Sequence, residues 1–252
     1  MKKSLFQALL LILIFAGIFY GLSQVNWMKL FRVEKVTDAL EKQLGDMVWS
    51  DMDKKSIESG PEYKKLDSVL NAICKGNGLN RDEIKLHLME DAEVNAFALP
   101  DHHMVVYTGL IKEAKSNDEI AGVLAHEIAH MELKHVMKKL VKQIGYSILI
   151  SITTGDAGGE VIKEVLGILT SSAYDRSLEK DADLKAVEYL KNAKLDVKAF
   201  ADFLYRLGEE NEGAVPLTWI STHPDPKERA KYILKEGQVT RTREVDQIKR
   251  NQ

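Results

Sequence analysis

The sequence predicts an α+β protein that is mainly helical, with a small antiparallel sheet packed beside its helices. Apolar residues recur at three- and four-residue spacing along most of the 252-residue chain, as amphipathic helices require. Apolar and polar residues alternate only between residues 84 and 108, where short strands are expected. A formal net charge of -3 argues against a nucleic-acid-binding protein, which usually carries a basic face. The single cysteine, Cys74, excludes an intrachain disulfide and a cysteine-rich metal cluster.

An apolar run at the N-terminus predicts a membrane segment. Leu5–Leu22 is almost entirely apolar and would span about 27 Å as a helix, close to the thickness of a bilayer's hydrocarbon core. Lys2 and Lys3 precede it, which favours a cytoplasmic N-terminus with the rest of the chain across the membrane. Small residues in Gly21–Ser23 leave cleavage as a signal peptide open. We therefore assign residues 1–25 to a membrane anchor or a signal peptide, and in both cases the remaining chain is exported.

Two helices and three strands are expected before the first chemical motif. The helices cover Asn26–Lys55 and Glu62–Lys75, and their apolar faces mark them as scaffold. The strands cover Ile84–Met89, Val94–Leu99 and Met104–Thr108. The turn between the last two strands holds His102 and His103, which we expect to be solvated.

The middle strand is a candidate substrate-binding element. Its central residues are short and small, and they are Asn95, Ala96, Phe97 and Ala98. An exposed strand edge can hold an extended peptide by main-chain hydrogen bonds. An ordinary hairpin would only support the neighbouring helix, and the sequence leaves both interpretations open.

The strongest motif is His126-Glu127-Ile128-Ala129-His130. Residues four apart lie on one face of a helix, so His126 and His130 can direct two imidazole nitrogens at one tetrahedral metal ion. Glu127 lies at the edge of that face, where it can reach a water held by the metal without being a ligand. This is the arrangement of zinc peptidases, with two ligands and a general base.

The sequence around the motif predicts one long helix over Ser116–Lys142. Ser116 and Glu119 have the spacing of a capping box, and no proline interrupts the helix. Two apolar pieces follow, Ile144–Thr154 and Val161–Leu169, each too short to cross a bilayer. We expect a pair of buried helices beside the cleft, with a lid or a membrane-touching hairpin as the alternative.

A second functional helix is expected over Asp175–Lys191. Glu179 and Asp183 lie four residues apart on one face, together with small alanines that allow close helix packing. Glu179 would complete a site of two histidines and one carboxylate with one position open. Asp183 would lie one turn further on, where it can accept a hydrogen bond from the far N–H of a ligand histidine.

The last expected elements are a helix over Asp196–Glu210 and a short helix that starts at Pro226 and stops at Gly237. His223 lies in the loop before that short helix. Residues 237–252 are polar and are expected to form a C-terminal tail.

Several separated motifs resemble those of one peptidase family. They are Asn95–Pro100, Val105–Leu110, His126–His130, Glu179–Asp183 and Ser221–Pro224. In this order and spacing they resemble the gluzincin peptidases that include HtpX, BepA, Oma-type proteases and the CAAX prenyl proteases. The chain departs from the usual pattern at Asp101–His103, where the family often has a Gly-Gly turn, and in having one expected membrane span. The span favours a single-span or exported bacterial member.

The resemblance implies a zincin-like metalloprotease core that holds one Zn²⁺ per chain. It implies that His126, His130 and Glu179 bind the metal, that Glu127 is the base and that the strand at 95–98 borders the substrate cleft. It further implies that His223 lies close to the metal, either assisting the transition state or occupying the fourth position in a latent state. An arginine that follows this histidine in the family corresponds to Arg229, which would orient the site.

The sequence therefore predicts a zinc-dependent endopeptidase in residues 26–236. Its expected substrates are unfolded or membrane-associated polypeptides, in quality control at a membrane or cell envelope. We expect a bacterial cytoplasmic-membrane protein with its catalytic domain on the periplasmic side, or a periplasmic protein if the N-terminal segment is cleaved. The alternative function is a latent-zinc envelope chaperone or binding protein. No nucleic acid is an expected partner, and the sequence does not define the oligomeric state.

Overall fold

A computed structural model describes residues 33–52, 56–155, 159–210 and 218–250 of the chain. The predicted N-terminal anchor lies outside these residues. Within the described ranges, no helix combines the length and the apolar character needed to cross a membrane. The chain divides into residues 1–40, of which Val33–Leu40 are described, and residues 41–252, which contain the site discussed below.

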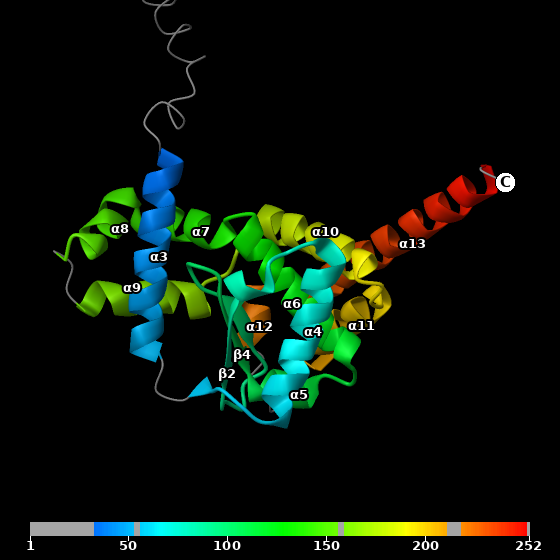
Figure 1. Cartoon of the computed structure of the whole chain (residues 1–252), viewed down its shortest axis with the longest axis horizontal. Helices are drawn as coiled ribbons and strands as arrows, with labels where there is room; N and C mark the ends of the chain where they lie inside the picture. The colour runs from blue at the N-terminus through cyan, green and yellow to red at the C-terminus, as the bar shows by residue number, and fades with distance from the viewer. Residues whose placement is uncertain (1–32, 53–55, 156–158, 211–217, 251–252) are drawn as a thin grey trace, which may run out of the picture. The chain divides into compact units, whose positions relative to one another are not determined.

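The described part is mainly helical with one four-stranded sheet, which confirms the predicted fold class (Figure 1). The first half contains α3 (Val33–Met52), β1 (Ser56–Ile57), α4 (Pro61–Asn77), a 3-10 turn η1 (Arg81–Glu83), β2 (Lys85–Met89), β3 (Ala96–Ala98), β4 (His103–Tyr107) and α5 (Thr108–Glu113). The second half contains α6 (Asn117–Glu132), α7 (His135–Ile144), α8 (Tyr146–Thr153), α9 (Gly159–Ser171), α10 (Arg176–Asn192), α11 (Val197–Glu210), α12 (Thr218–Thr222) and α13 (Pro226–Arg250).

The sheet is mixed rather than antiparallel as expected. Its strand order is β1-β2-β4-β3, with β3 and β4 antiparallel and β2 and β4 parallel. The chain passes from β2 to the outer position, forms β3 and returns as β4 between the two. Because β4 takes the inner position, it pairs directly with β2, and these two strands run in the same direction. Alternation along the sequence defines strands, but it does not define which strand lies between two others.

The helix that carries the motif, α6, packs against α4, α10 and α11 (Figure 1) and against β3. The hydroxyl of Ser116 accepts a hydrogen bond from the amide of Glu119 at 3.2 Å, as expected for an N-cap. The Glu119 carboxylate reaches back one residue further than a standard capping box, to the amide of Lys115 at 2.7 Å. Gly122 allows the close approach of α11, since a Cβ atom there would lie 2.4 Å from Phe200 Cβ.

The predicted single helix over Ser116–Lys142 is wrong, because α6 ends at Glu132 and α7 begins at His135. Between them, Lys134 has a φ of 57°, in the left-handed region. A residue in that conformation cannot continue a right-handed helix, so the chain turns there. Lysine gives no local sequence signal for such a turn, which explains the error.

The predicted stop at Gly237 is also wrong, since α13 continues to Arg250. A glycine inside a helix costs about 1 kcal/mol relative to alanine but does not end it. A Cβ atom on Gly237 would lie 3.2 Å from a methyl group of Val197, at the start of α11. The glycine therefore reflects close packing between α11 and α13.

Candidate metal centre

Two histidines on α6 form the base of the site. His126 and His130 lie one helical turn apart with fully buried side chains, and their Nε2 atoms are 3.0 Å apart. The helix places both rings on the face that packs against α10. The two nitrogens therefore converge on one point, as the four-residue spacing predicted.

Glu179, in the first turn of α10, reaches the same point. One carboxylate oxygen lies 3.6 Å from His126 Nε2, and the other lies 3.3 Å from His130 Nε2. Metal–ligand distances of about 2.0–2.1 Å in a tetrahedral zinc site imply ligand–ligand distances of about 3.3–3.4 Å. The three side chains thus form a triangle, with the two Glu179 oxygens at one corner, and its measured distances are close to that length.

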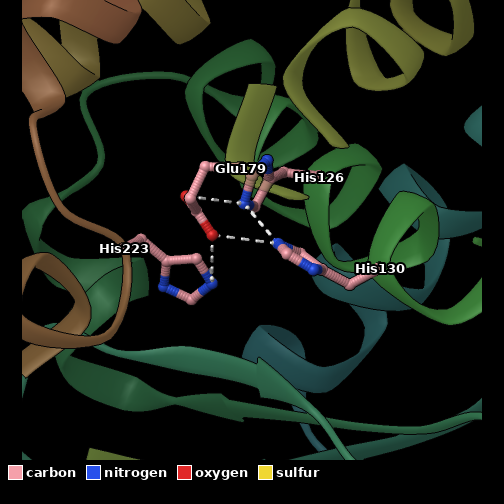
Figure 2. Close-up of side chains that lie close together, drawn as sticks. All are labelled: His126, His130, Glu179 and His223. Carbon is pink, nitrogen blue, oxygen red and sulfur yellow. Dashed lines mark hydrogen bonds and ion pairs between the residues drawn. The ribbon is translucent and has the colours of Figure 1, made fainter. Parts of the chain in front are cut away.

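His223, directly after α12, lies beside the triangle (Figure 2). Its Nε2 atom is 4.0 Å from a Glu179 oxygen and 3.5 Å from a Glu127 oxygen. One donor atom from each of His126, His130, Glu179 and His223 lies within 4.8 Å of the other three. His223 lies in the loop between α12 and α13, as predicted, and its side chain is fully buried there.

Three of the polar atoms around this point have no hydrogen-bond partner. Both oxygens of Glu179 and the Nε2 atom of His223 are buried without a hydrogen bond. Each buried polar atom without a partner lowers the stability of the fold by about 1–3 kcal/mol. Imidazole nitrogens and a carboxylate are ligands that zinc prefers. The residues present therefore fit a metal ion.

Buried charges surround the ligands. Asp183, one turn after Glu179, lies 2.9 Å from His126 Nδ1 and receives two hydrogen bonds from the Arg229 guanidinium at 2.8 Å. The hydroxyl of Tyr232 donates to the same carboxylate. Burial alone would raise the pKa of Asp183, but Arg229 and His126 hold it below its usual value. An ionised Asp183 keeps the proton of His126 on Nδ1 and leaves Nε2 free for a metal.

Arg229 also contacts Glu179, with Nη1 2.6 Å from a carboxylate oxygen, although the pair lacks the geometry of a hydrogen bond. This guanidinium thus joins two carboxylates of α10 to α13. Its proximity favours the ionised form of Glu179, against the effect of burial, which raises the pKa of that carboxyl.

His135 is a residue that sequence reasoning missed. Its Nδ1 atom lies 3.2 Å from His130 Nδ1, and its side chain is buried. Burial lowers the pKa of His135 to about 4, so its ring is neutral and its Nδ1 atom can accept a hydrogen bond from the Nδ1–H group of His130. In a continuous helix, a residue five positions after His130 would point about 140° away from it. The turn at Lys134 brings the two rings together.

Glu127 is fully buried beside the ligands. Its carboxylate accepts a hydrogen bond from the backbone amide of Ala98 at 3.0 Å and lies 3.4 Å from the indole nitrogen of Trp219. Burial and the nearby Glu179 raise the pKa of Glu127 to about 8. A carboxyl group whose pKa lies near neutrality can both accept and donate a proton at physiological pH.

The predicted substrate strand lies next to this carboxylate, as β3 at the end of the described sheet. The side chains of Asn95, Ala96, Phe97 and Ala98 are all buried, and α9 lies against β3. The expected exposed edge is therefore covered. The side-chain oxygen of Asn95 is buried without a hydrogen-bond partner.

Comparison with protein families matches residues 62–236 to peptidase family M48. The chain belongs to this family. The matched residues include the paired histidines, Glu179 and His223 of the site described above. This membership confirms the resemblance drawn from the separated sequence motifs.

Several curated proteins are similar to the chain. The mitochondrial metalloendopeptidase OMA1 of Schizosaccharomyces pombe is 28% identical over 187 residues, covering 72% of this chain and 56% of the relative. The putative beta-barrel assembly-enhancing protease of Vibrio cholerae is 32% identical over 155 residues, covering 56% and 32%. The metalloprotease LoiP of Escherichia coli is 28% identical over 213 residues, covering 81% and 82%. The chain thus spans about half, or less, of the length of the OMA1 and beta-barrel assembly relatives.

Proposed function

We propose that this member of peptidase family M48 is a zinc-dependent endopeptidase in which His126, His130 and Glu179 hold the metal. The observation that carries the proposal is the convergence of the Nε2 atoms of His126 and His130 with the two unpartnered oxygens of Glu179. Their separations of 3.0, 3.3 and 3.6 Å are close to those in a tetrahedral zinc site. When bound, zinc would polarise the scissile carbonyl and lower the pKa of a water from about 15.7 to about 7.

Glu127 is the proposed general base. It takes a proton from the attacking water and passes it to the leaving amine nitrogen. Its position next to the ligands supports both transfers, and the raised pKa of its carboxyl favours keeping the proton until the amine leaves. The amide of Ala98 orients one carboxylate oxygen, so the other remains directed toward Trp219 and His223.

His223 is the proposed stabiliser of the developing oxyanion. The hydroxyl of Thr222 lies 2.9 Å from His223 Nδ1, and the Trp219 ring stacks on the imidazole with 4.6 Å between centroids. These contacts hold the ring with Nε2 toward the ligand triangle. A protonated Nε2 can donate a hydrogen bond to an oxyanion there.

Peptide binding along β3 is proposed for Asn95, Ala96, Phe97 and Ala98. The unpartnered side-chain oxygen of Asn95 supports this, because a peptide N–H could satisfy it. In the described conformation, all four donor residues of the metal centre are at most 2% exposed. A polypeptide can therefore reach the centre only after the elements that cover it move.

The buried His223 favours the second candidate, a latent zinc protein that binds polypeptides with little turnover. In that state His223 Nε2 would take the fourth position, which its place among the four donor residues supports. The two candidates share one metal centre and differ in whether that position opens.

We further propose that the chain acts in quality control of membrane or envelope proteins. The name of the Vibrio cholerae relative supports this, since β-barrel assembly concerns outer-membrane proteins. The apolar run within residues 1–25 supports attachment to the cytoplasmic membrane with residues 26–236 as a periplasmic catalytic domain, or periplasmic release after cleavage. Unfolded and membrane-associated polypeptides are the proposed substrates, and residues 237–252 are proposed as a tail beyond this domain.

The test is incubation of the purified full chain with unfolded casein. We expect cleavage that stops with a chelator and returns with added zinc. Glu127→Gln should keep its metal and lose activity by about 10²–10⁴-fold, the usual contribution of general acid–base catalysis. Casein that is bound but never cleaved would favour the latent protein, and full turnover by Glu127→Gln would contradict the assigned base.

A further inference from the structure

A cavity of about 210 Å³ lies between α7 and the segment that leads into α10. Its lining includes three lysines and an amide, and its polar residues are Lys138, Lys139, Lys142, Gln143, Tyr174 and Asp175. The lysine side chains outnumber the single carboxylate. Asp175 is already paired, with its oxygens 2.7 Å from Lys142 Nζ.

Lys139 is the unusual member of this lining. Its side chain is only 3% exposed, and its ammonium group is buried without a hydrogen-bond partner. The Nζ atom lies 4.1 Å from the ring centroid of Tyr174, a cation–π contact that offsets part of the cost of burial. A buried ammonium ordinarily requires an anion or several acceptors.

Tyr174 links Lys139 to the metal centre. Its ring lies 4.1 Å from that of His130 and 5.5 Å from that of His223, measured between centroids. The cavity is therefore next to the ligands, and is separated from them by one aromatic ring. A peptide bound at the centre would have side chains within reach of it.

Charge balance points in the same direction. Arg229 forms a bidentate ion pair with Asp183 and also lies 2.6 Å from a Glu179 oxygen. A divalent metal would therefore leave the described residues around the centre with an excess of positive charge, to which the unpartnered ammonium of Lys139 contributes.

We propose that this cavity is a substrate subsite that binds a carboxylate through Lys139. The carboxylate would come from an aspartate or glutamate side chain near the scissile bond, or from the C-terminus of the peptide. The amide of Gln143 supplies a further donor at the cavity wall. The volume is several times the roughly 30 Å³ of a water molecule, so a carboxylate side chain fits. This inference rests on the proposed endopeptidase function.

The test uses fluorogenic peptides that differ only by glutamate or glutamine at one position, scanned across the three residues on each side of the cleaved bond. We expect the full chain to prefer glutamate at one position by about tenfold in kcat/KM, as for a charge-assisted hydrogen bond. Lys139→Met should reduce this ratio to less than about twofold. Lys64→Met, the same change at an exposed site on α4, should keep it. Equal cleavage of every pair, or an unchanged ratio in Lys139→Met, would overturn the proposal.

Two further arms separate the alternatives. Peptides with a free or an amidated C-terminus distinguish a terminal carboxylate from a side chain. Binding of the same pairs to Glu127→Gln, followed by fluorescence anisotropy, measures the preference without turnover. If no peptide is cleaved but glutamate still binds tighter, the endopeptidase function fails while the subsite stands.

Thermal unfolding tests whether Lys139 is structural instead. Replacing an unpaired buried charge by an apolar side chain of similar length should leave the unfolding temperature unchanged or raise it. A strong fall, together with equal losses on glutamate and glutamine peptides, would show that Lys139 supports the fold and would refute the subsite.

Discussion

Among the described residues, two clusters bring histidine nitrogens and carboxylate oxygens within 4.8 Å of each other. One is the metal centre on α6 and α10. The other lies at the sheet and consists of Asp46, Asp101 and His103. Proximity alone does not distinguish them, so the partners of each atom must be compared.

At the sheet, an ammonium group already satisfies the cluster. Lys85 Nζ lies 2.5 Å from an Asp101 oxygen, 3.6 Å from an Asp46 oxygen and 3.1 Å from His103 Nε2. The other nitrogen of His103 lies 2.9 Å from His87 Nε2. At the metal centre, by contrast, neither Glu179 oxygen nor His223 Nε2 has a hydrogen-bond partner, although Arg229 Nη1 lies 2.6 Å from one of the oxygens. The comparison teaches that unsatisfied buried donor atoms, rather than proximity, indicate the metal site.

The largest expected effect on metal binding follows from Glu179→Ala. Removing one of three ligands should lower the metal content after dialysis from about one ion per chain to less than a tenth. Inductively coupled plasma mass spectrometry measures it. Glu188→Ala, on an exposed part of the same helix, is the control. If Glu179→Ala kept about one metal ion per chain, Glu179 would not be a ligand, and its unpartnered oxygens would not distinguish the metal centre from the sheet cluster.

Asp183→Asn should have the next largest effect. The amide cannot reproduce the charge that holds the His126 proton on Nδ1, and we expect a metal affinity lower by about 10–100-fold. Competition with a chromogenic chelator measures the affinity. The change also leaves the Arg229 charge less compensated, so circular dichroism must show that the variant is folded. Unchanged affinity in a folded variant would contradict the role of Asp183.

His135→Leu should weaken metal binding less, by about tenfold. Loss of the acceptor allows the His130 ring to adopt the other tautomer, with its proton on the metal-facing nitrogen. His135→Gln keeps an acceptor and should recover part of the affinity. Equal losses in both variants would show that packing, rather than the hydrogen bond, is what His135 contributes.

His103→Gln should leave the metal content unchanged, because the sheet cluster already contains its cation. Its effect should instead be on stability. Burial and Lys85 lower the pKa of His103 to about 4, so the folded protein resists protonation there while the unfolded chain accepts it near pH 6.5. Well above pH 6.5, the His103 side chain has little effect on the free energy of unfolding. As the pH falls from 6.5 to 4, it lowers that free energy progressively.

Urea unfolding at pH 7 and pH 5 tests this effect. Between pH 7 and pH 5, the free energy of unfolding of the unmodified protein should fall by about 2 kcal/mol more than that of His103→Gln. His102→Gln, at a partly exposed neighbouring position, should behave like the unmodified protein. If the unmodified protein bound a second metal ion that His103→Gln lost, the sheet cluster would also be a metal site, and the contrast between the two clusters would be wrong.

Local patterns in the sequence determined much of this protein. Spacing of four placed His126 with His130, and Glu179 with Asp183, on shared helix faces, because helical geometry depends only on neighbouring residues. Capping at Ser116 and the glycine end of α4 at Gly78 were likewise readable. The helical character, the strands and the likeness to peptidase family M48 all followed from such patterns.

Only the tertiary structure decided which distant groups meet. The sequence did not show that His103, expected in a solvated turn, is buried in β4, nor that β4 takes the inner position of the sheet. It also did not show the turn at Lys134, which brings His135 to His130. The unpaired ammonium of Lys139 was equally hidden. These features depend on packing between segments far apart in the chain, and the free energy of burial that selects them is not encoded in any short window.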